Sequence, residues 1–223
     1  MKESIKKRYK NYLNRFFDPN VSFRQKWAAF WRYSGMAAGL LIEKARGVDY
    51  ALIYHEDNAN PFFGHYTMSP KKVLKRIFDD TENIPDKSFI DVGCGKGYAV
   101  KEAAKKGFKT SGGIEYNEHL YEICLSNLKK EKVSTEYVYL GMAQDFEHYD
   151  LFDVIYFNNP FRVEILSPVL KKIAESHSGK PCRCYYLNTS PDRAEAFSEA
   201  GFRLVKTITD PSEPYFTMNV YEY

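Results

Sequence analysis

From Pro85 onward, short β-rich runs alternate with segments that have the apolar spacing of helices. The β-rich runs are 88–92, 110–115, 135–140, 153–157, 183–187, 202–208 and 216–223. The segments with helical spacing between them are 97–106, 118–130, 163–176 and 192–200. Strands that alternate with helices pair in parallel and carry helices on both faces of the sheet, so the pattern predicts an α/β fold. The link between the last two runs is too short for a helical crossover, which predicts that they pair antiparallel.

The N-terminal part of the chain has a different character. Residues 1–46 hold eleven Lys or Arg against three acidic residues, a net charge of +8, and the rest of the chain carries −5. Apolar residues recur at helical spacing on both sides of a break at residues 18–20. We therefore expect a basic helical extension over residues 1–60 and a second domain over residues 61–223.

The extension has two candidate roles. A basic segment can contact phosphate groups, which makes nucleic acid a candidate partner. It also holds several large aromatic residues: Phe16, Phe17, Trp27, Phe30 and Trp31. So many large apolar groups are rarely left exposed on a soluble protein. We therefore favour a role in covering the substrate site of the acidic domain.

Composition excludes several classes of protein. The longest apolar run, residues 35–42, is too short to cross a bilayer. The four cysteines lack the spacing of a disulfide framework or a zinc site, which is typical of a cytoplasmic protein. Cys182 and Cys184 alternate on an expected strand, so we expect them to be buried, and the five histidines form no ligand cluster. The sequence therefore predicts no metal site.

A glycine-rich turn follows the first expected strand. Gly93, Gly95 and Gly97 form a G-x-G-x-G pattern, and Asp91 precedes them. Glycines allow a ligand to approach the backbone closely. A dinucleotide-binding turn has its third glycine one position later, where this chain has Tyr98. The carboxylate of Asp91 would repel a pyrophosphate, but it favours the sulfonium and ammonium groups of S-adenosylmethionine.

This stretch resembles the first motif of the class I S-adenosylmethionine-dependent methyltransferases, and the resemblance covers roughly residues 62–223. It implies a Rossmann-like, seven-stranded, mostly parallel sheet with an antiparallel last strand, and S-adenosylmethionine as cofactor. Glu115 ends the second expected strand, where an acidic residue can accept both ribose hydroxyls. Tyr116 is then expected beside the adenine.

The third expected strand leads to a departure from the family pattern. Met142 stands where an Asp commonly accepts from the adenine amino group. We expect Met142 to pack on the adenine ring and the backbone N–H of Ala143 to reach a ring nitrogen. Gln144 or Asp145 could supply the missing acceptor. Earlier in the chain, Tyr66 precedes the helix that usually covers the cofactor in this family, so we expect it to close over the cofactor.

The fourth expected strand ends in Asn158-Asn159-Pro160-Phe161. This stretch resembles the fourth motif of the amino-methylating branch of the family. There a side-chain oxygen and a backbone carbonyl accept hydrogen bonds from the target amino group, and the aromatic residue stacks on the substrate. Asn159 stands where proline is usual, so either asparagine could be the acceptor. The resemblance implies that all four residues serve catalysis.

The resemblance therefore implies methyl transfer to a nitrogen of an unidentified substrate, which could be a protein side chain, a nucleic-acid base or a small amine. Asparagine is a poor general base, which suits a neutral nitrogen better than a hydroxyl. Two alternatives are a nicotinamide-dependent oxidoreductase, against which Tyr98 and Asp91 argue, and a noncatalytic module that binds S-adenosylmethionine or anchors a complex.

Overall fold

A computed structural model of the chain describes residues 22–52, 54, 62, 66–210 and 213–223. The chain forms two compact units, Met1–Gly47 and Val48–Tyr223. The sequence-based division was expected after residue 60, but Val48 and Tyr50 are buried in the core of the second unit. Residues 48–52 therefore belong structurally with the domain that follows them.

The first unit contains one described helix, α2 (Phe23–Arg46). It agrees with the helix expected after the break at residues 18–20. The helix expected before that break, with Phe16 and Phe17, lies outside the described residues.

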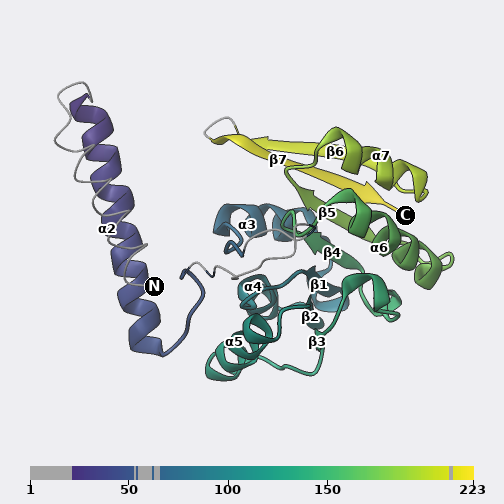
Figure 1. Cartoon of the computed structure of the whole chain (residues 1–223), viewed down its shortest axis with the longest axis horizontal. Helices are drawn as coiled ribbons and strands as arrows, with labels where there is room; N and C mark the ends of the chain where they lie inside the picture. Colours follow the sequence, from purple (N-terminus) through teal and green to yellow (C-terminus); the bar gives the residue numbers. More distant parts are fainter. Residues whose placement is uncertain (1–21, 53, 55–61, 63–65, 211–212) are drawn as a thin grey trace. The chain divides into compact units, whose positions relative to one another are not determined.

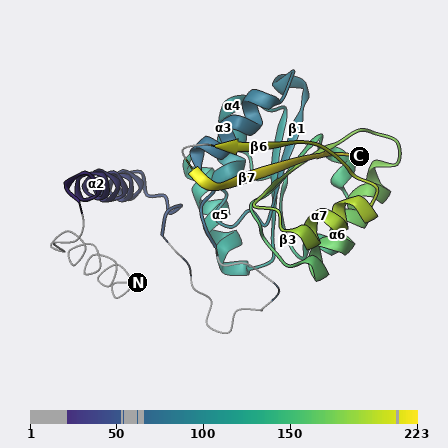
Figure 2. The ribbon, with the colours of Figure 1, turned by 90° about the horizontal axis from the view of Figure 1, so that it is seen from above.

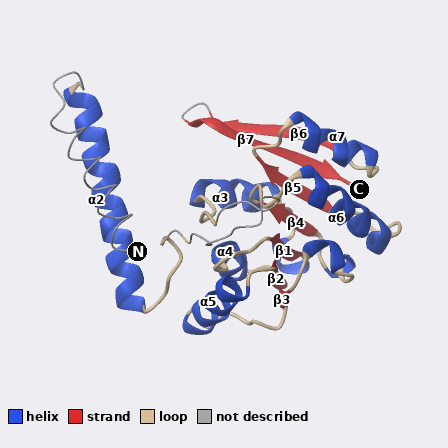
Figure 3. Ribbon diagram, viewed as in Figure 1, coloured by secondary structure: helices blue, strands red, loops and turns tan. Residues whose placement is uncertain are grey.

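The second unit is built on a seven-stranded sheet with the order β3-β2-β1-β4-β5-β7-β6 (Figures 1 and 3). Its strands are β1 (Ser88–Val92), β2 (Thr110–Glu115), β3 (Val138–Leu140), β4 (Val154–Phe157), β5 (Arg183–Leu187), β6 (Arg203–Asp210) and β7 (Glu213–Glu222). The first five strands pair in parallel, and β7 is antiparallel to both β5 and β6. The predicted α/β fold and its antiparallel last strand are confirmed.

The bounds of three strands, β3, β6 and β7, differ from those expected by two or more residues. β3 is shorter at its start, because residues 136–137 form a turn in which the N–H of Val138 donates to the carbonyl of Thr135 at 3.1 Å. β6 and β7 extend further toward each other, and their pairing reaches Asp210 and Glu213. The last two strands therefore form a longer hairpin than their apolar pattern indicated.

Helices cover both faces of the sheet, as Figure 2 shows. The helices of the first face are α3 (Lys71–Asp80), α4 (Tyr98–Lys106) and α5 (Glu118–Lys130). Those of the second face are α6 (Val163–His177) and α7 (Pro191–Glu199). Side chains alternate along each strand, so Phe89 packs in the core under α3 and α4, and Ile90 packs in the core under α6 and α7.

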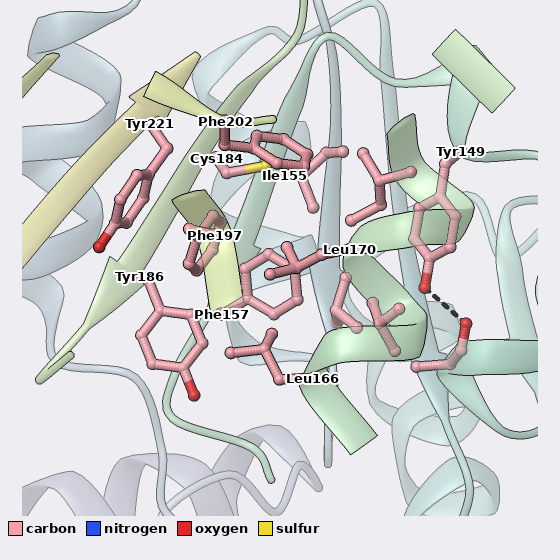
Figure 4. Packing of buried hydrophobic residues seen from close by; sticks show 14 of the residues in the cluster. Tyr149, Ile155, Phe157, Leu166, Leu170, Cys184, Tyr186, Phe197, Phe202 and Tyr221 are labelled. Carbon is pink, nitrogen blue, oxygen red and sulfur yellow. Dashed lines mark hydrogen bonds between the residues drawn. The ribbon is translucent and has the colours of Figure 1, made fainter. Parts of the chain in front are cut away.

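Aromatic rings dominate the core on the α6 and α7 face (Figure 4). Phe197 of α7 stacks on Tyr221 with ring centroids 3.9 Å apart, and Phe157 stacks on Tyr186 at 5.4 Å. Cys184 is buried in the same core, and Cys182 is buried beside it, as expected. This packing fixes β4, whose carboxyl end leads to Asn158, and its neighbour β5.

The parallel strands β1, β2 and β4 end at the same edge of the sheet. Their carboxyl ends present Asp91, Glu115 and Asn158 at that edge, which is where ligands bind in open α/β sheets. No helix within the described part of the chain is long and apolar enough to span a bilayer.

Candidate functional site

The turn between β1 and α4 depends on three glycines with positive φ. The φ values are +82° at Gly93, +53° at Gly95 and +80° at Gly97. Residues with a Cβ adopt this region at a cost, so the turn requires glycine. A Cβ atom on Gly97 would also lie 2.5 Å from the Sγ atom of Cys124 in α5. The sequence pattern therefore has a direct steric explanation.

The turn also contacts two other predicted site residues. A Cβ atom on Gly93 would lie 2.6 Å from the Cβ atom of Pro160, which follows β4. A Cβ atom on Gly95 would lie 2.4 Å from the ring of Tyr66. The structure thus brings the glycine turn, the segment after β4 and Tyr66 together, although they are far apart in the sequence.

Asp91 lies on β1 and is 2% exposed. Its Oδ1 atom accepts no hydrogen bond from any residue that the structure describes. Burial, and to a lesser extent the nearby carboxylate of Glu115, raises the pKa of Asp91 well above its ordinary value. A buried carboxyl group without a partner is costly, and a bound cation would provide its missing counter-charge.

Glu115 ends β2 and is also buried. Its Oε2 atom accepts from the backbone N–H of Gly95 at 2.7 Å, and its Oε1 atom accepts from the backbone N–H of Asn117 at 2.9 Å. A carboxylate can accept about four hydrogen bonds, so this arrangement is compatible with ribose hydroxyls as further donors. Tyr116, the next residue, is half-buried at the end of the strand.

The segment after β3 lies next to Glu115, because the N–H of Gly141 donates to the carbonyl of Glu115 at 2.9 Å. Met142 is half-buried there, and Ala143 is buried at the start of a short 3-10 turn. The carbonyl of Ala143 accepts from the hydroxyl of Tyr149 at 2.8 Å, the hydrogen bond drawn in Figure 4. This bond fixes the backbone that carries the Ala143 N–H.

Two residues were expected as alternative acceptors for the adenine amino group. Asp145 is exposed. Gln144 is half-buried, and its buried Oε1 atom has no partner among the described residues. Buried amide oxygens normally accept a hydrogen bond, so this unpaired oxygen favours Gln144 over Asp145 as the acceptor for the adenine amino group.

The two asparagines after β4 have different environments. The Nδ2 atom of Asn158 donates to the carbonyl of Thr67 at 3.1 Å. Asn159 has a φ of +50°, and its Oδ1 atom accepts from the hydroxyl of Tyr186 at 3.4 Å. Asparagine tolerates the left-handed region better than most residues. Asn159 therefore forms the turn. The side-chain amide of Asn158 is oriented with its nitrogen toward the carbonyl of Thr67.

Phe161 differs from the position that the resemblance implies. It is 3% exposed, and its ring lies in the core at 6.3 Å from that of Phe157, in an edge-to-face arrangement. Its side chain therefore packs in the interior instead of facing a substrate.

Several residues that the sequence pattern did not indicate adjoin the glycine turn. Lys96, inside the turn, is 2% exposed and pairs with Asp49, with its Nζ atom 2.8 Å from both carboxylate oxygens. Asn127 of α5 donates from Nδ2 to the carbonyls of Asp49 at 2.8 Å and Lys96 at 3.1 Å. The only feature of the sequence that could have indicated these contacts is the position of Lys96 between two glycines of the motif.

Comparison with known proteins identifies the family. A family model described as a methyltransferase domain matches residues 84–206, more than half of the chain. The chain belongs to this methyltransferase family. The match decides against the oxidoreductase alternative: the protein is a methyltransferase, and S-adenosylmethionine is its cofactor. No curated protein matches the sequence.

Solved structures share the fold of the methyltransferase at low sequence identity. A ribosomal protein methylase of Lactobacillus delbrueckii subsp. bulgaricus is 15% identical, with a TM-score of 0.54 over 67% of this chain and 76% of that chain. A TehB-like SAM-dependent methyltransferase of Corynebacterium glutamicum is 14% identical, with a TM-score of 0.52 over 67% and 86%. A precorrin-6y methyltransferase of Geobacter metallireducens is 13% identical, with a TM-score of 0.50 over 70% and 88%. Since their names include different acceptors, the fold alone does not indicate what this enzyme methylates.

The residues at the carboxyl edge of the sheet fit S-adenosylmethionine. The buried Oδ1 atom of Asp91 lacks a described partner, which suits a cationic ligand. Three positions of the turn, Gly93, Gly95 and Gly97, carry no Cβ atom, which lets Pro160, Tyr66 and Cys124 pack directly against its backbone beside the buried carboxyl groups. Glu115 adds a second buried carboxylate at the neighbouring strand end. This set suits the positive charges and the ribose of the cofactor and would disfavour a pyrophosphate.

Proposed function

We propose that this methyltransferase transfers a methyl group to a neutral nitrogen atom, and that Asn158 orients that nitrogen. The observation that carries the proposal is the hydrogen bond from Nδ2 of Asn158 to the carbonyl of Thr67. With its nitrogen held there, the amide directs its Oδ1 atom away from Thr67, and that oxygen can accept from an N–H group of a substrate.

The position of Asn158 relative to the cofactor turn supports this role. Pro160, two residues later, packs directly on Gly93 of the turn. The segment after β4 therefore lies against the backbone that we propose binds the cofactor. Asn159 is the weaker candidate, because its Oδ1 atom already accepts from Tyr186 and its left-handed backbone serves the turn.

The reaction requires little acid–base chemistry from the chain. S-adenosylmethionine supplies the methyl group from its sulfonium when it is bound. In the proposed transfer, the acceptor nitrogen would form the new N–CH₃ bond as the S–CH₃ bond breaks, with S-adenosylhomocysteine as the leaving group. The proton lost from the nitrogen passes to water, because an asparagine amide cannot take it. The chain thus acts by holding the donor and acceptor in line and within reach.

We further propose which residues would hold the cofactor. Asp91 would provide the negative charge for the methionine end, and Glu115 would accept from the ribose. Tyr116 and Met142 would contact the adenine, with the Ala143 N–H as donor to the ring. Gln144 would take the place of the missing family Asp as acceptor for the adenine amino group.

Labelled methyl transfer tests the proposed function. The full-length protein is incubated with tritiated S-adenosylmethionine and a cell extract that has been separated into protein, RNA and small-molecule fractions. We expect label in one fraction that survives mild alkali, because N-methyl groups are stable to base and methyl esters are hydrolysed. Label that is lost in alkali, or found on carbon or oxygen, would contradict transfer to nitrogen.

Two variants then test the role of Asn158. We expect Asn158→Ala to abolish transfer and to leave the affinity for S-adenosylmethionine close to that of the wild type. Asn159→Gly is the matched control, since glycine adopts the same left-handed backbone, and it should retain transfer. Loss of activity in Asn159→Gly alone would assign the acceptor role to Asn159.

A further inference from the structure

Residues 48–52, which we call the strap, lie outside the region that matches the methyltransferase family and contact its glycine turn. The Nζ atom of Lys96 lies 2.8 Å from both carboxylate oxygens of Asp49 and 2.8 Å from the carbonyl oxygen of Leu52. These three contacts match the three donors of an ammonium group. The side chain of Lys96 is 3% exposed and that of Asp49 is 34% exposed, so the ammonium group is shielded from water and the carboxylate is only partly shielded.

A second set of hydrogen bonds fixes the strap to α5. The N–H of Asp49 donates to Oδ1 of Asn127 at 2.9 Å, and Nδ2 of Asn127 donates back to the carbonyl of Asp49 at 2.8 Å. Nδ2 of Asn127 also donates to the carbonyl of Lys96 at 3.1 Å. One buried side chain therefore joins the backbone of the strap to the backbone of the glycine turn.

The strap in turn holds Tyr66. The carbonyl of Tyr50 accepts from the hydroxyl of Tyr66 at 2.5 Å, and Tyr50 itself is 2% exposed. The ring of Tyr66 lies against Gly95, and the Nζ atom of Lys96 is 5.2 Å from the centre of that ring. Tyr66 thus contacts the strap through its hydroxyl group and the glycine turn through its ring.

We propose that Lys96 and Asp49 are positioning residues for cofactor binding. Their ion pair holds the strap, the strap fixes Tyr66 through the Tyr50 carbonyl, and Tyr66 covers the glycine turn. The pair also explains how a lysine is tolerated inside a turn that binds a cationic cofactor. The ammonium group points into the strap, and Asp49 neutralises its charge. This inference does not depend on which atom the enzyme methylates.

Calorimetric titration of S-adenosylmethionine into full-length variants tests the pair. We expect Lys96→Met and Asp49→Asn each to raise the Kd about tenfold, since an ordered cover is lost in both. The double variant should bind no more weakly than Lys96→Met alone, because the two residues act as one unit. Tyr66→Phe, which removes only the hydroxyl donor to Tyr50, should raise the Kd in the same direction.

Hydrogen exchange provides a readout that general destabilisation would not reproduce. In Lys96→Met and Asp49→Asn, we expect the amides of residues 48–52 to exchange faster than in the wild type, with exchange in β4 and β5 unchanged. Lys105→Met is the matched control, because it breaks another ion pair between α4 and the end of α5, with Glu131. It should change neither the Kd nor the exchange of the strap.

The proposal fails if Lys96→Met and Asp49→Asn both bind S-adenosylmethionine as the wild type does. It also fails if the Kd rises without faster exchange in the strap, since the pair would then act on the cofactor directly. Should Lys96→Met not fold, Asp49→Asn and Tyr66→Phe decide the question by the same two measurements. All of these outcomes leave the nature of the methyl acceptor untouched.

Discussion

Asp91 combines a structural cost with the role that we propose for it in cofactor binding. Its carboxyl group is buried without a described partner, and its pKa is raised by burial and then by Glu115. The folded chain therefore holds this proton more tightly than the unfolded chain does. Stability should fall as the pH rises above the unfolded value of about 3.9 and through the raised pKa of the folded state.

This leads to a prediction for Asp91→Asn in the absence of cofactor. The amide cannot ionise, so at neutral pH the variant should be more stable than the wild type, by about 1–3 kcal/mol. The difference should vanish at low pH, where Asp91 is protonated. Urea unfolding between pH 4 and pH 8 measures it. A variant that is less stable than the wild type at pH 8 would show that the carboxylate has a partner in the folded chain.

Single residues also mark the limits of sequence reasoning. Asn158 and Asn159 are adjacent and chemically identical, and they differ only in their backbone conformation and in their hydrogen-bond partners, which the sequence does not indicate. Phe161 matches the aromatic position of the family motif, yet it is buried. A motif predicts residue types at a strand end, but the direction of each side chain depends on packing with distant elements.

At the scale of elements, the glycine turn offers a paired test. Gly95→Ala places a Cβ atom against the ring of Tyr66, so we expect S-adenosylmethionine affinity to fall at least about tenfold. Gly107→Ala is the control, because Gly107 also has a positive φ, +98°, but a Cβ atom there meets nothing within 4 Å. It should cost about 1 kcal/mol of stability and leave affinity unchanged. Equal affinities in the two variants would show that Tyr66 does not shape the site.

The elements were largely predictable because their patterns are local. The bounds of β1, β2, β5 and α5 agree with the sequence expectation, since each combines an apolar period with a flanking turn or cap. The strap was not predictable. Asp49 and Lys96 lie far apart in the sequence, and neither residue type in isolation indicates a partner. Contacts of this kind arise only once the helices have packed.

At the scale of the whole molecule, the two units differ in the sign of their net charge. Residues 1–46 carry +8, and the remainder of the chain carries −5. The role that we favour for the extension, covering the substrate site, stays a prediction. We expect deletion of residues 1–46 to leave S-adenosylmethionine affinity unchanged, because the strap begins after them, and to broaden the range of acceptors that are methylated.

Nucleic-acid binding is the competing role of the extension, and salt dependence distinguishes it. Contacts with phosphates release counterions, so affinity would fall steeply and linearly with the logarithm of salt concentration. We expect RNA and DNA to bind weakly and without that slope. Tight binding with a steep slope, lost on deletion of residues 1–46, would instead assign the extension to nucleic acid.

The most direct test of the account is calorimetric titration of S-adenosylmethionine into the wild type, Asp91→Ala and Glu115→Ala. Asp153→Ala is the control, because Asp153 accepts from the N–H of Ser88 at 2.8 Å, at the opposite end of β1. We predict that both site variants fold and bind at least about tenfold more weakly, and that the control binds like the wild type. Unchanged affinity in both site variants would contradict the placement of the cofactor at the carboxyl ends of β1 and β2.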